Sequence, residues 1–343
     1  MEQRDAALSH LHLGTRYTHP RGCHRVTYVT VYRGGTVELV SASSERKAEL
    51  LRVYGGGLSF AICTNRPENL HNAASVARSI GSQDELIVVL DLPPDALRDA
   101  LPDALLSPKV RLLQNPANKG LSYSRNRALA ECANSTLVYV DDDVTFAAET
   151  VEAMRAARTA GSGIVGVLLV PEFGASRGGW WLSGGQYHYL GVHHRADQAR
   201  PWGACMAVDA RFANARGIRF REELGRRGRA LQSGDDTSFL GELRAAGASE
   251  SVLTDVRATH HISTDRVRLA YLLRRAWWQG RSEYRRGTFL RALAKEWRRN
   301  VGPGPAQAPG ARRYALGALF VSSVIAGGLS EVVSAPPGRR SGG

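Results

Sequence analysis

The stretch LVYVDDDVTF, from Leu137 to Phe146, runs an apolar, strand-like segment directly into three consecutive aspartates. Neighbouring carboxylates repel one another and resist burial, so a fold that places them beside a buried strand usually supplies a cation, a proton or solvent. A solvated acidic turn or a calcium site would meet that need as well as a catalytic metal site, although the EF-hand pattern is absent. The segments around this stretch decide between these interpretations.

Apolar segments alternate with helix-like segments on the amino-terminal side of the aspartates. LSFAICT, ELIVVLD and VRLLQN are typical of strands, and helices are expected over residues 68–80, just after Pro94, and over residues 122–132. Short, near-continuous apolar strands separated by helices indicate a mostly parallel sheet that is covered on both faces. We therefore expect an α/β fold, in which ligands bind at the carboxyl ends of the strands.

Polar residues collect at the ends of these predicted strands. They are Thr64-Asn65-Arg66, Asp91, Asn115 with Asn118-Lys119-Gly120, and Asp141-Asp142-Asp143. Proteins usually hold a nucleoside diphosphate through Mg²⁺ or Mn²⁺ bound by one or two carboxylates, with phosphates and water as the other ligands. Neither GxGxxG nor GxxxxGK[ST] occurs, so a dinucleotide site of the Rossmann type and a P-loop are not supported.

Three further segments complete the expected organisation. Residues 1–57 form an N-terminal extension in which VTYVTVY and TVELVSAS are expected to pair as a β-hairpin around Arg33-Gly34-Gly35. GIVGVLLV is expected to be a strand, and the following FGASRGGWWLSGGQYHYLG is a lid, a substrate-binding wall or a surface insertion. Asp235-Asp236 precede an amphipathic helix. Two acids at this position can cap the helix and interact favourably with its dipole, or they can take part in catalysis.

The order of these motifs resembles the family 2 glycosyltransferases with the GT-A fold. The segments that carry the resemblance are TNRPENL, VVLD, NKGLSYSRNRAL, VYVDDDV, WGACMAVDARFA, GDDTSFLGELRAAG and THHISTDR, between Leu58 and Tyr284. The resemblance implies a Rossmann-like catalytic domain over residues 58–265. It also implies an inverting enzyme that uses Mn²⁺ or Mg²⁺ to transfer one sugar from a nucleoside-diphosphate sugar to an acceptor hydroxyl.

The resemblance also assigns roles to individual residues. It implies that Asp236 is the general base, beside Asp235, which stands where the family usually has glutamate. It implies that Asp143 is a direct metal ligand, with Asp141 and His260 as further ligands. His260 is preferred to His261 because Arg266 then falls at the family's arginine six positions later. The nucleotide sugar is expected to contact the remaining matched positions: Thr64, Arg66, Asp91, Lys119, Gly120, Arg125, Asp141, Asp142, Trp202 and Gly203.

One motif of the processive polysaccharide synthases, QxxRW, is missing. Arg274-Arg275 with Trp277-Trp278 is only loosely similar to it, so we expect transfer of single sugars.

Two other functions stay open. A nucleotidyltransferase would also use carboxylates, but would attack the α-phosphate and release pyrophosphate. A non-enzymatic basic protein would bind nucleic acid or membrane, although no zinc finger or RRM signature supports nucleic acid as a partner.

The basic residues of the chain concentrate toward its carboxyl end. The net charge is +13 over 343 residues, with clusters between Arg266 and Arg299 and at Arg312-Arg313. An apolar run of 17 residues, Tyr314 to Ser330, follows the second cluster, against about 20 residues for a membrane-spanning helix. We expect residues 266–343 to be helical. The apolar run would then contact an anionic membrane surface, pack on the enzyme's own body or span the bilayer.

The four cysteines and the N-terminal residues indicate the compartment. The cysteines lie far apart and form no CxxC pair, and the first residues, MEQRDAALSHLHLG, are polar and interrupted. This pattern suggests neither a disulfide framework nor secretion, so we expect a cytoplasmic enzyme, peripheral at the inner face of the cell membrane. The sequence does not identify the acceptor, for which we consider a lipid-linked sugar, a glycan and a small natural product.

Overall fold

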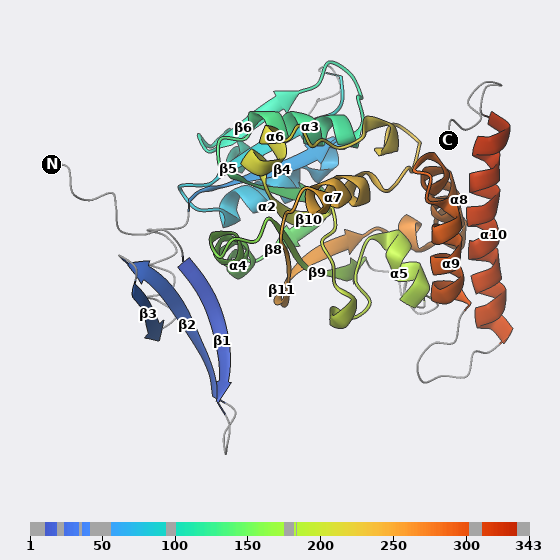
Figure 1. Cartoon of the computed structure of the whole chain (residues 1–343). Coiled ribbons are helices and arrows are strands. Elements are labelled where there is room, and N and C mark those ends of the chain that lie inside the picture. The colour runs from blue at the N-terminus through green and yellow to red at the C-terminus, as the bar shows by residue number, and fades with distance from the viewer. Residues whose placement is uncertain are drawn as a thin grey trace.

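An eight-stranded sheet forms the centre of the protein (Figure 1). The structure, a computed structural model, describes residues 11–18, 24–33, 36–41, 56–93, 101–174, 182, 184–301 and 311–334. The order of the strands in the sheet is β6-β5-β4-β7-β10-β9-β11-β8. Their bounds are β4 (Leu58–Thr64), β5 (Glu85–Leu90), β6 (Val110–Gln114), β7 (Thr136–Asp141), β8 (Val144–Phe146), β9 (Ile164–Phe173), β10 (Cys205–Asp209) and β11 (Glu250–Ile262).

The direction of the strands divides the sheet into two parts. Strands β6, β5, β4 and β7 are parallel to one another, as expected from their apolar sequences. Strand β10 is antiparallel to both of its neighbours, β7 and β9, while β11 is parallel to β9 and antiparallel to β8. The α/β fold class is confirmed. The reversal at β10 was not predicted, because it depends on which strands become neighbours.

Helices cover both faces of the sheet, since alternate residues of each strand point to opposite sides. Phe60 and Ile62 pack in the core beneath α2 and α4, whereas Ala61 and Tyr139 pack beneath α3, α6 and α7. The helices expected over residues 68–80 and 122–132 are present as α2 and α3, and the helix expected after Pro94 falls outside the described residues. The bounds are α2 (Leu70–Ser79), α3 (Leu121–Glu131), α4 (Ala148–Thr159), α5 (Gly184–Leu190), α6 (Ala210–Ala215) and α7 (Asp235–Ala245).

The loop after β7 carries the aspartates into a turn. Strand β7 ends at Asp141, and β8 begins at Val144 and pairs with β11. The N–H of His261 donates to the carbonyl oxygen of Asp143 at 2.8 Å. A register shift in β11 between Leu253 and Arg257 adjusts its pairing with β9, as bulges near functional sites often do. These pairings bring β11 beside the third aspartate.

The N-terminal residues form a second, three-stranded antiparallel sheet of β1 (Leu11–Thr18), β2 (His24–Arg33) and β3 (Thr36–Ser41). The expected hairpin is confirmed as β2 and β3, which pair up to Arg33 and Thr36 on either side of the two glycines. Strand β1 was not predicted, because its histidines and arginine made that stretch look like a polar leader.

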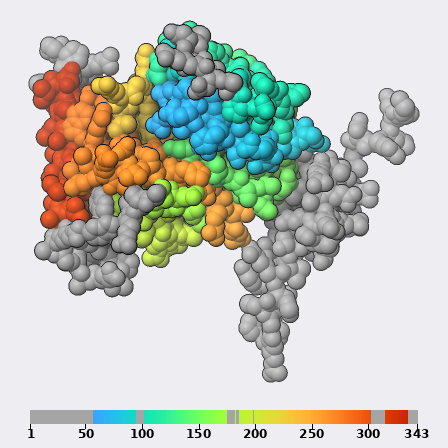
Figure 2. Space-filling view, turned by 180° about the vertical axis from the view of Figure 1, so that it is seen from behind, coloured from blue at the N-terminus to red at the C-terminus, as the bar shows by residue number. Residues whose placement is uncertain are grey.

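Three helices form the carboxyl-terminal part, α8 (Leu269–Arg285), α9 (Phe289–Asn300) and α10 (Ala311–Ser334), and they lie side by side at one end of the molecule (Figures 1 and 2). Phe320 and Val324 of α10 are fully buried in a core shared with α5 and α8. A Cβ atom on Gly280 of α8 would overlap the carbonyl oxygen of Val324, so the two helices are in close backbone contact. The expected packing of the apolar run on the protein is therefore present along one face.

Helix α10 also meets the length and composition of a membrane-crossing helix. Among the described residues this applies to Tyr314–Ser334, which has a hydropathy of 1.8, and 33% of that window is buried in the protein. Length and composition alone do not distinguish such a helix from the core helix of a soluble protein. The loop expected to be a lid, a substrate-binding wall or a surface insertion falls outside the described residues at 175–181 and 183, and its last part forms α5.

Candidate active site

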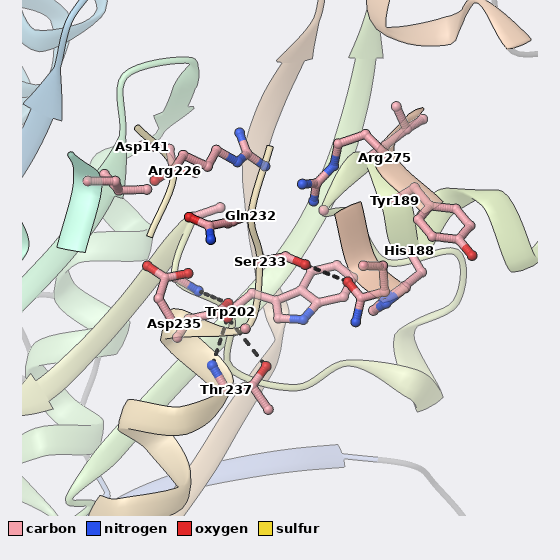
Figure 3. A pocket seen from close by; sticks show the side chains of 18 of the residues that line it. Asp141, His188, Tyr189, Trp202, Arg226, Gln232, Ser233, Asp235, Thr237 and Arg275 are labelled. Carbon is pink, nitrogen blue, oxygen red and sulfur yellow. Dashed lines mark hydrogen bonds between the residues drawn. The ribbon is translucent and has the colours of Figure 1, made fainter. Parts of the chain in front are cut away.

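Two cavities adjoin at the carboxyl ends of the parallel strands. The larger, of about 500 Å³, is lined by Thr64, Arg66, Asp91 and the three aspartates after β7. The smaller, of about 110 Å³, lies toward α5, α7 and α8 (Figure 3). Asp141, Leu121 and Arg226 line both cavities. Most of the residues expected at the site line one cavity or the other: Thr64, Arg66, Asp91, Arg125, Asp141, Asp142, Asp143, Trp202, Gly203, Asp235, Asp236 and His260.

Arg125 of α3 ties the two acidic motifs together. Its Nη2 donates to Asp141 Oδ1 at 2.8 Å, and its Nη1 donates to Asp235 Oδ2 at 2.9 Å. Nη2 also donates to the carbonyl oxygen of Gly203 at 3.0 Å. Burial alone would lower the pKa of Arg125, but the charges of Asp235, Asp141 and Asp236 raise it above its ordinary value. Arg125 is therefore a permanent cation that fixes the carboxylates of β7 and α7 relative to each other.

The two acids that begin α7 have different surroundings. Asp235 is 6% exposed, and burial raises the pKa of its carboxyl, against the lowering effect of Arg125. Asp236 is half-buried and faces the smaller cavity. Its Oδ2 accepts from the Gly203 N–H at 3.1 Å, and its Oδ1 accepts from the Thr237 N–H at 2.7 Å. Backbone donors thus orient the Asp236 carboxylate, whereas the Asp235 carboxylate is held by the Arg125 guanidinium.

Asp143 is held by two partners, one in β11 and one in the turn that follows it. Its Oδ1 lies 3.0 Å from His260 Nε2, and its Oδ2 accepts from Arg266 Nη1 at 2.6 Å. Burial would raise the pKa of Asp143, but the charges of His260 and Arg266 and the hydrogen bond from His260 lower it below its usual range. His261 points elsewhere, with Nε2 2.8 Å from Thr145 Oγ1 and Nδ1 3.0 Å from Glu172 Oε2. Of the two histidines, His260 is the one at the site.

Thr64 and Asp142 line the larger cavity and are hydrogen-bonded to each other. Thr64 Oγ1 donates to Asp142 Oδ2 at 2.5 Å, and Asn72 Nδ2 donates to the Asp142 carbonyl oxygen at 2.8 Å. Burial, followed by the charge of Asp143, raises the pKa of Asp142. Arg66 is exposed at the rim of the cavity.

Asp91 organises the loop between β6 and α3. Its Oδ1 accepts from the Lys119 N–H at 2.7 Å and from Asn115 Nδ2 at 2.8 Å, and its Oδ2 accepts from the Gly120 N–H at 2.8 Å. Lys119 and Gly120 are not among the described residues that line either cavity. Their backbone N–H groups instead donate to Asp91, which lines the larger cavity.

Trp202 and Gly203 line the smaller cavity. The indole of Trp202 stacks on His193, with ring centroids 4.7 Å apart and an angle of 6° between the planes. A Cβ atom on Gly203 would lie 2.9 Å from Arg125 Nη1 and 3.0 Å from the Asp236 Cβ. A side chain at this position would therefore push apart the two residues that Gly203 joins.

The donor atoms suit a divalent ion in part. Carboxylate oxygens and an imidazole nitrogen are ligands that Mn²⁺ accepts, and the 3.0 Å between Asp143 Oδ1 and His260 Nε2 is a separation that two neighbouring ligands can have. Among the described residues, no group of three His, Cys, Asp or Glu side chains gathers around one point. A third ligand would have to come from a shift of Asp141, from substrate phosphates or from water.

Several cavity residues were not predicted from the sequence. Arg226 lies between the two cavities, and Arg275 and Gln279 of α8 and Gln232 line the smaller one (Figure 3). The arginine cluster just before Asp235-Asp236 was the available signal for Arg226. Arg275 belongs to the segment that only loosely resembles QxxRW, and the packing of α8 brings this segment to the site.

Comparisons with known proteins find a family match over part of the chain. Residues 60–219 match the sequence model of the family described as Glycosyl transferase family 2. The succinoglycan biosynthesis protein ExoM of Rhizobium meliloti (strain 1021) is 25% identical over 299 residues, which cover 80% of this chain and 94% of ExoM. The family match ends before Asp235-Asp236 and His260.

Solved structures share the fold. The mannosyltransferase PcManGT from Pyrobaculum calidifontis, in complex with GDP-Man and Mn²⁺, has a TM-score of 0.50 at 16% identity, covering 85% of this chain and 82% of that one. Residues 1–349 of S. aureus TarS give a TM-score of 0.44 at 14% identity, covering 82% and 93%. The chain has the GT-A fold, and its residues 60–219 match the family 2 glycosyltransferases, to which its motifs are also similar.

Proposed function

We propose that the protein transfers one sugar from a nucleoside-diphosphate sugar to an acceptor hydroxyl, with inversion at the anomeric carbon. The observation that carries this proposal is the arrangement of the two adjoining cavities around Asp141. The larger has a volume suited to a nucleotide, and the smaller presents the Asp236 carboxylate. PcManGT, which shares the fold, was solved with a nucleotide sugar and Mn²⁺, which supports a donor of this class.

In this proposal, Thr64, Asp91 and the loop that Asp91 organises hold the nucleoside. Arg226 and Arg266 line the larger cavity, where their charges offset the negative charge that develops on the departing diphosphate. Asp236 takes the proton of the acceptor hydroxyl, which attacks the anomeric carbon from the face opposite the leaving group. Asp235 acts through Arg125 and is a positioning residue.

Asp143, Asp141 and His260 would hold a divalent ion, Mn²⁺ or Mg²⁺. When bound, the ion would supply Lewis-acid stabilisation of the diphosphate oxygens. Arg266 Nη1 lies 2.6 Å from Asp143 Oδ2 and 3.2 Å from His260 Nε2, so this arginine would have to move away before the two side chains could hold the ion.

Donor binding tests this assignment. Thermal unfolding with UDP-, GDP- and dTDP-sugars should show a stabilising ligand only when Mn²⁺ or Mg²⁺ is present, because ligand binding to the folded state raises its stability. We expect Asp143→Ala to lose most of this metal-dependent shift. Binding of equal strength in wild type and Asp143→Ala, with and without metal, would remove the metal from the mechanism.

We also propose that the protein works at the cytosolic face of a membrane, as a peripheral protein. The outer face of α10 is apolar, with Leu329 54% and Val333 86% exposed. Helix α9 exposes Trp297 and Leu290 next to Arg291 and Arg298. Tryptophan with basic residues suits the interface of an anionic membrane, and an apolar helix face adds binding by burial. A lipid-linked acceptor would be reached from this position.

A further inference from the structure

Arg275 is a buried cation without a carboxylate partner among the described residues. It projects from α8 into the smaller cavity and is 6% exposed (Figure 3). Nη1 donates to the carbonyl oxygen of Leu231 at 2.6 Å, and Nε is buried with no hydrogen-bond partner in the part of the chain that the structure describes. Buried polar groups are nearly always paired, so this unpaired donor calls for an explanation.

The electrostatic environment of Arg275 differs from that of the other buried arginines of the site. Arg125 and Arg266 form ion pairs with aspartates, and these aspartates raise the pKa of each guanidinium. Burial, followed by repulsion from Arg226, lowers the pKa of Arg275 to about 9. A buried charge without a counterion costs stability, and a bound anion would offset that cost.

The position of Arg275 separates it from the expected site of the donor diphosphate. Arg226 lines both cavities, whereas Arg275 lines only the smaller one, together with Asp236. His188 lies on the same side of this cavity, with Nδ1 3.1 Å from Arg200 Nη2, and burial and the charges of Arg299, Arg200 and Arg275 lower its pKa. One side of the cavity is therefore acidic, and the side formed by α8 and α5 is basic.

We propose that the smaller cavity binds a carboxylate or phosphate group carried by a sugar substrate, and that Arg275 contacts this group. The inference rests on the proposed function, in which the acceptor hydroxyl gives its proton to Asp236, a residue that lines this cavity. The flat guanidinium presents paired N–H donors that match either oxyanion, and a charge-assisted hydrogen bond in a buried site is strong. The group belongs to the acceptor or to the transferred sugar, because the diphosphate lies on the other side of Arg226.

Anion binding to the full-length protein tests the proposal. Melting temperatures are measured with inorganic phosphate, with glucuronate and with glucose, each with and without UDP and Mn²⁺. We expect phosphate and glucuronate, but not glucose, to stabilise the wild type in the presence of UDP. Arg275→Gln should weaken this binding about tenfold or more, the loss expected for one charge-assisted hydrogen bond. Arg275→Lys should keep part of it.

Arg274→Gln is the matched control, because Arg274 is the exposed neighbour of Arg275 on α8 and should leave anion binding unchanged. Equal phosphate binding in wild type and Arg275→Gln, with both variants folded, would overturn the proposal. Displacement of phosphate by UDP would also overturn it, because Arg275 would then bind the donor diphosphate.

Two further measurements decide whether the anionic group is carried by the transferred sugar or by the acceptor. A loss confined to UDP-glucuronate hydrolysis, with UDP-glucose hydrolysis unchanged, would put the group on the transferred sugar. A loss confined to glucuronate binding beside UDP would put it on the acceptor. Failure of the proposed function appears separately, as the absence of nucleotide-sugar binding in the wild type while phosphate still binds through Arg275.

Discussion

Arg125 makes one site out of two motifs that are far apart in the sequence. It bonds Asp141 at the end of β7, Asp235 at the start of α7 and the carbonyl oxygen of Gly203 between them. Removing a buried partner of this kind leaves the opposite charges uncompensated, at a cost of about 3–5 kcal/mol. The geometry of Asp236 therefore depends on Arg125 and Gly203, since Gly203 accepts from Arg125 and donates to Asp236.

Tyr271 reports on the charge of the larger cavity. Burial alone would raise the pKa of its phenol, but the charges of Arg266, Arg226 and Arg275 lower it to about 8. The folded state then loses the proton before the unfolded state does, so this group adds stability as the pH rises from about 8 toward its unfolded value of about 10. Tyr271→Phe should remove that increase.

Absorbance at the tyrosinate band measures this prediction directly. We expect the wild type to show one phenol that ionises near pH 8, and Tyr271→Phe to lack it. A bound nucleoside diphosphate should move the ionisation to higher pH, because its charge offsets that of the arginines. If no phenol ionised below the ordinary pKa of tyrosine, the arginines would not face Tyr271 in solution.

At the scale of elements, the close contact between α8 and α10 positions Arg275. A Cβ atom on Gly327 of α10 would overlap the carbonyl oxygen of Trp277, two residues from Arg275. We expect Gly327→Ala to lower the free energy of unfolding by about 1–3 kcal/mol, the usual cost of overpacking. Denaturant or thermal unfolding of the purified variant measures this change.

Gly241→Ala is the control for helix propensity. Gly241 lies in α7 with nothing within 4 Å of an added Cβ atom, so alanine should stabilise the protein by about 0.5–1 kcal/mol. The two substitutions should therefore have opposite signs. Stabilisation by both would mean that α10 does not pack on α8.

The elements that could be predicted from the sequence are those whose signal is local. The apolar strands β4, β5 and β7 and the helices α2 and α3 have the expected periodicity, and the motif order located Asp141, Asp143 and Asp236. The antiparallel direction of β10, the pairing of β8 with β11 and the approach of α8 depend on contacts between distant segments. Arg226 and Arg275 belong to this second group, because neither residue lies in a motif that the family resemblance covers.

At the scale of the whole molecule, α9 and α10 lie together at one end of the protein (Figure 2). Their outer faces expose apolar side chains, among them Trp297, Leu329 and Val333, beside the arginines of α9. We expect the double variant Trp297→Ser, Leu329→Ser to bind anionic vesicles more weakly, since both side chains are more than half exposed and removing them leaves the buried face of α10 intact. Flotation with liposomes measures the bound fraction, which should also fall with added salt.

Leu106→Ser is the control for membrane binding, because Leu106 is 66% exposed on the catalytic domain. It should float like the wild type. Equal flotation of the double variant and the wild type on anionic vesicles would exclude this surface as the contact. Salt-resistant binding to neutral vesicles would instead favour a spanning α10.

The proposal that Asp236 is the base of a sugar transfer is tested most directly by Asp236→Asn. The amide keeps the shape of the carboxylate but cannot take the proton, so donor binding should stay near that of the wild type. Turnover should fall by about 10²–10⁴-fold, the usual contribution of a general base. The measurement is the rate of nucleoside diphosphate release from the donor identified by thermal unfolding, with donor affinity measured on the same preparation. A variant that turned over at more than about a tenth of the wild-type rate would contradict the assignment of Asp236 as the general base.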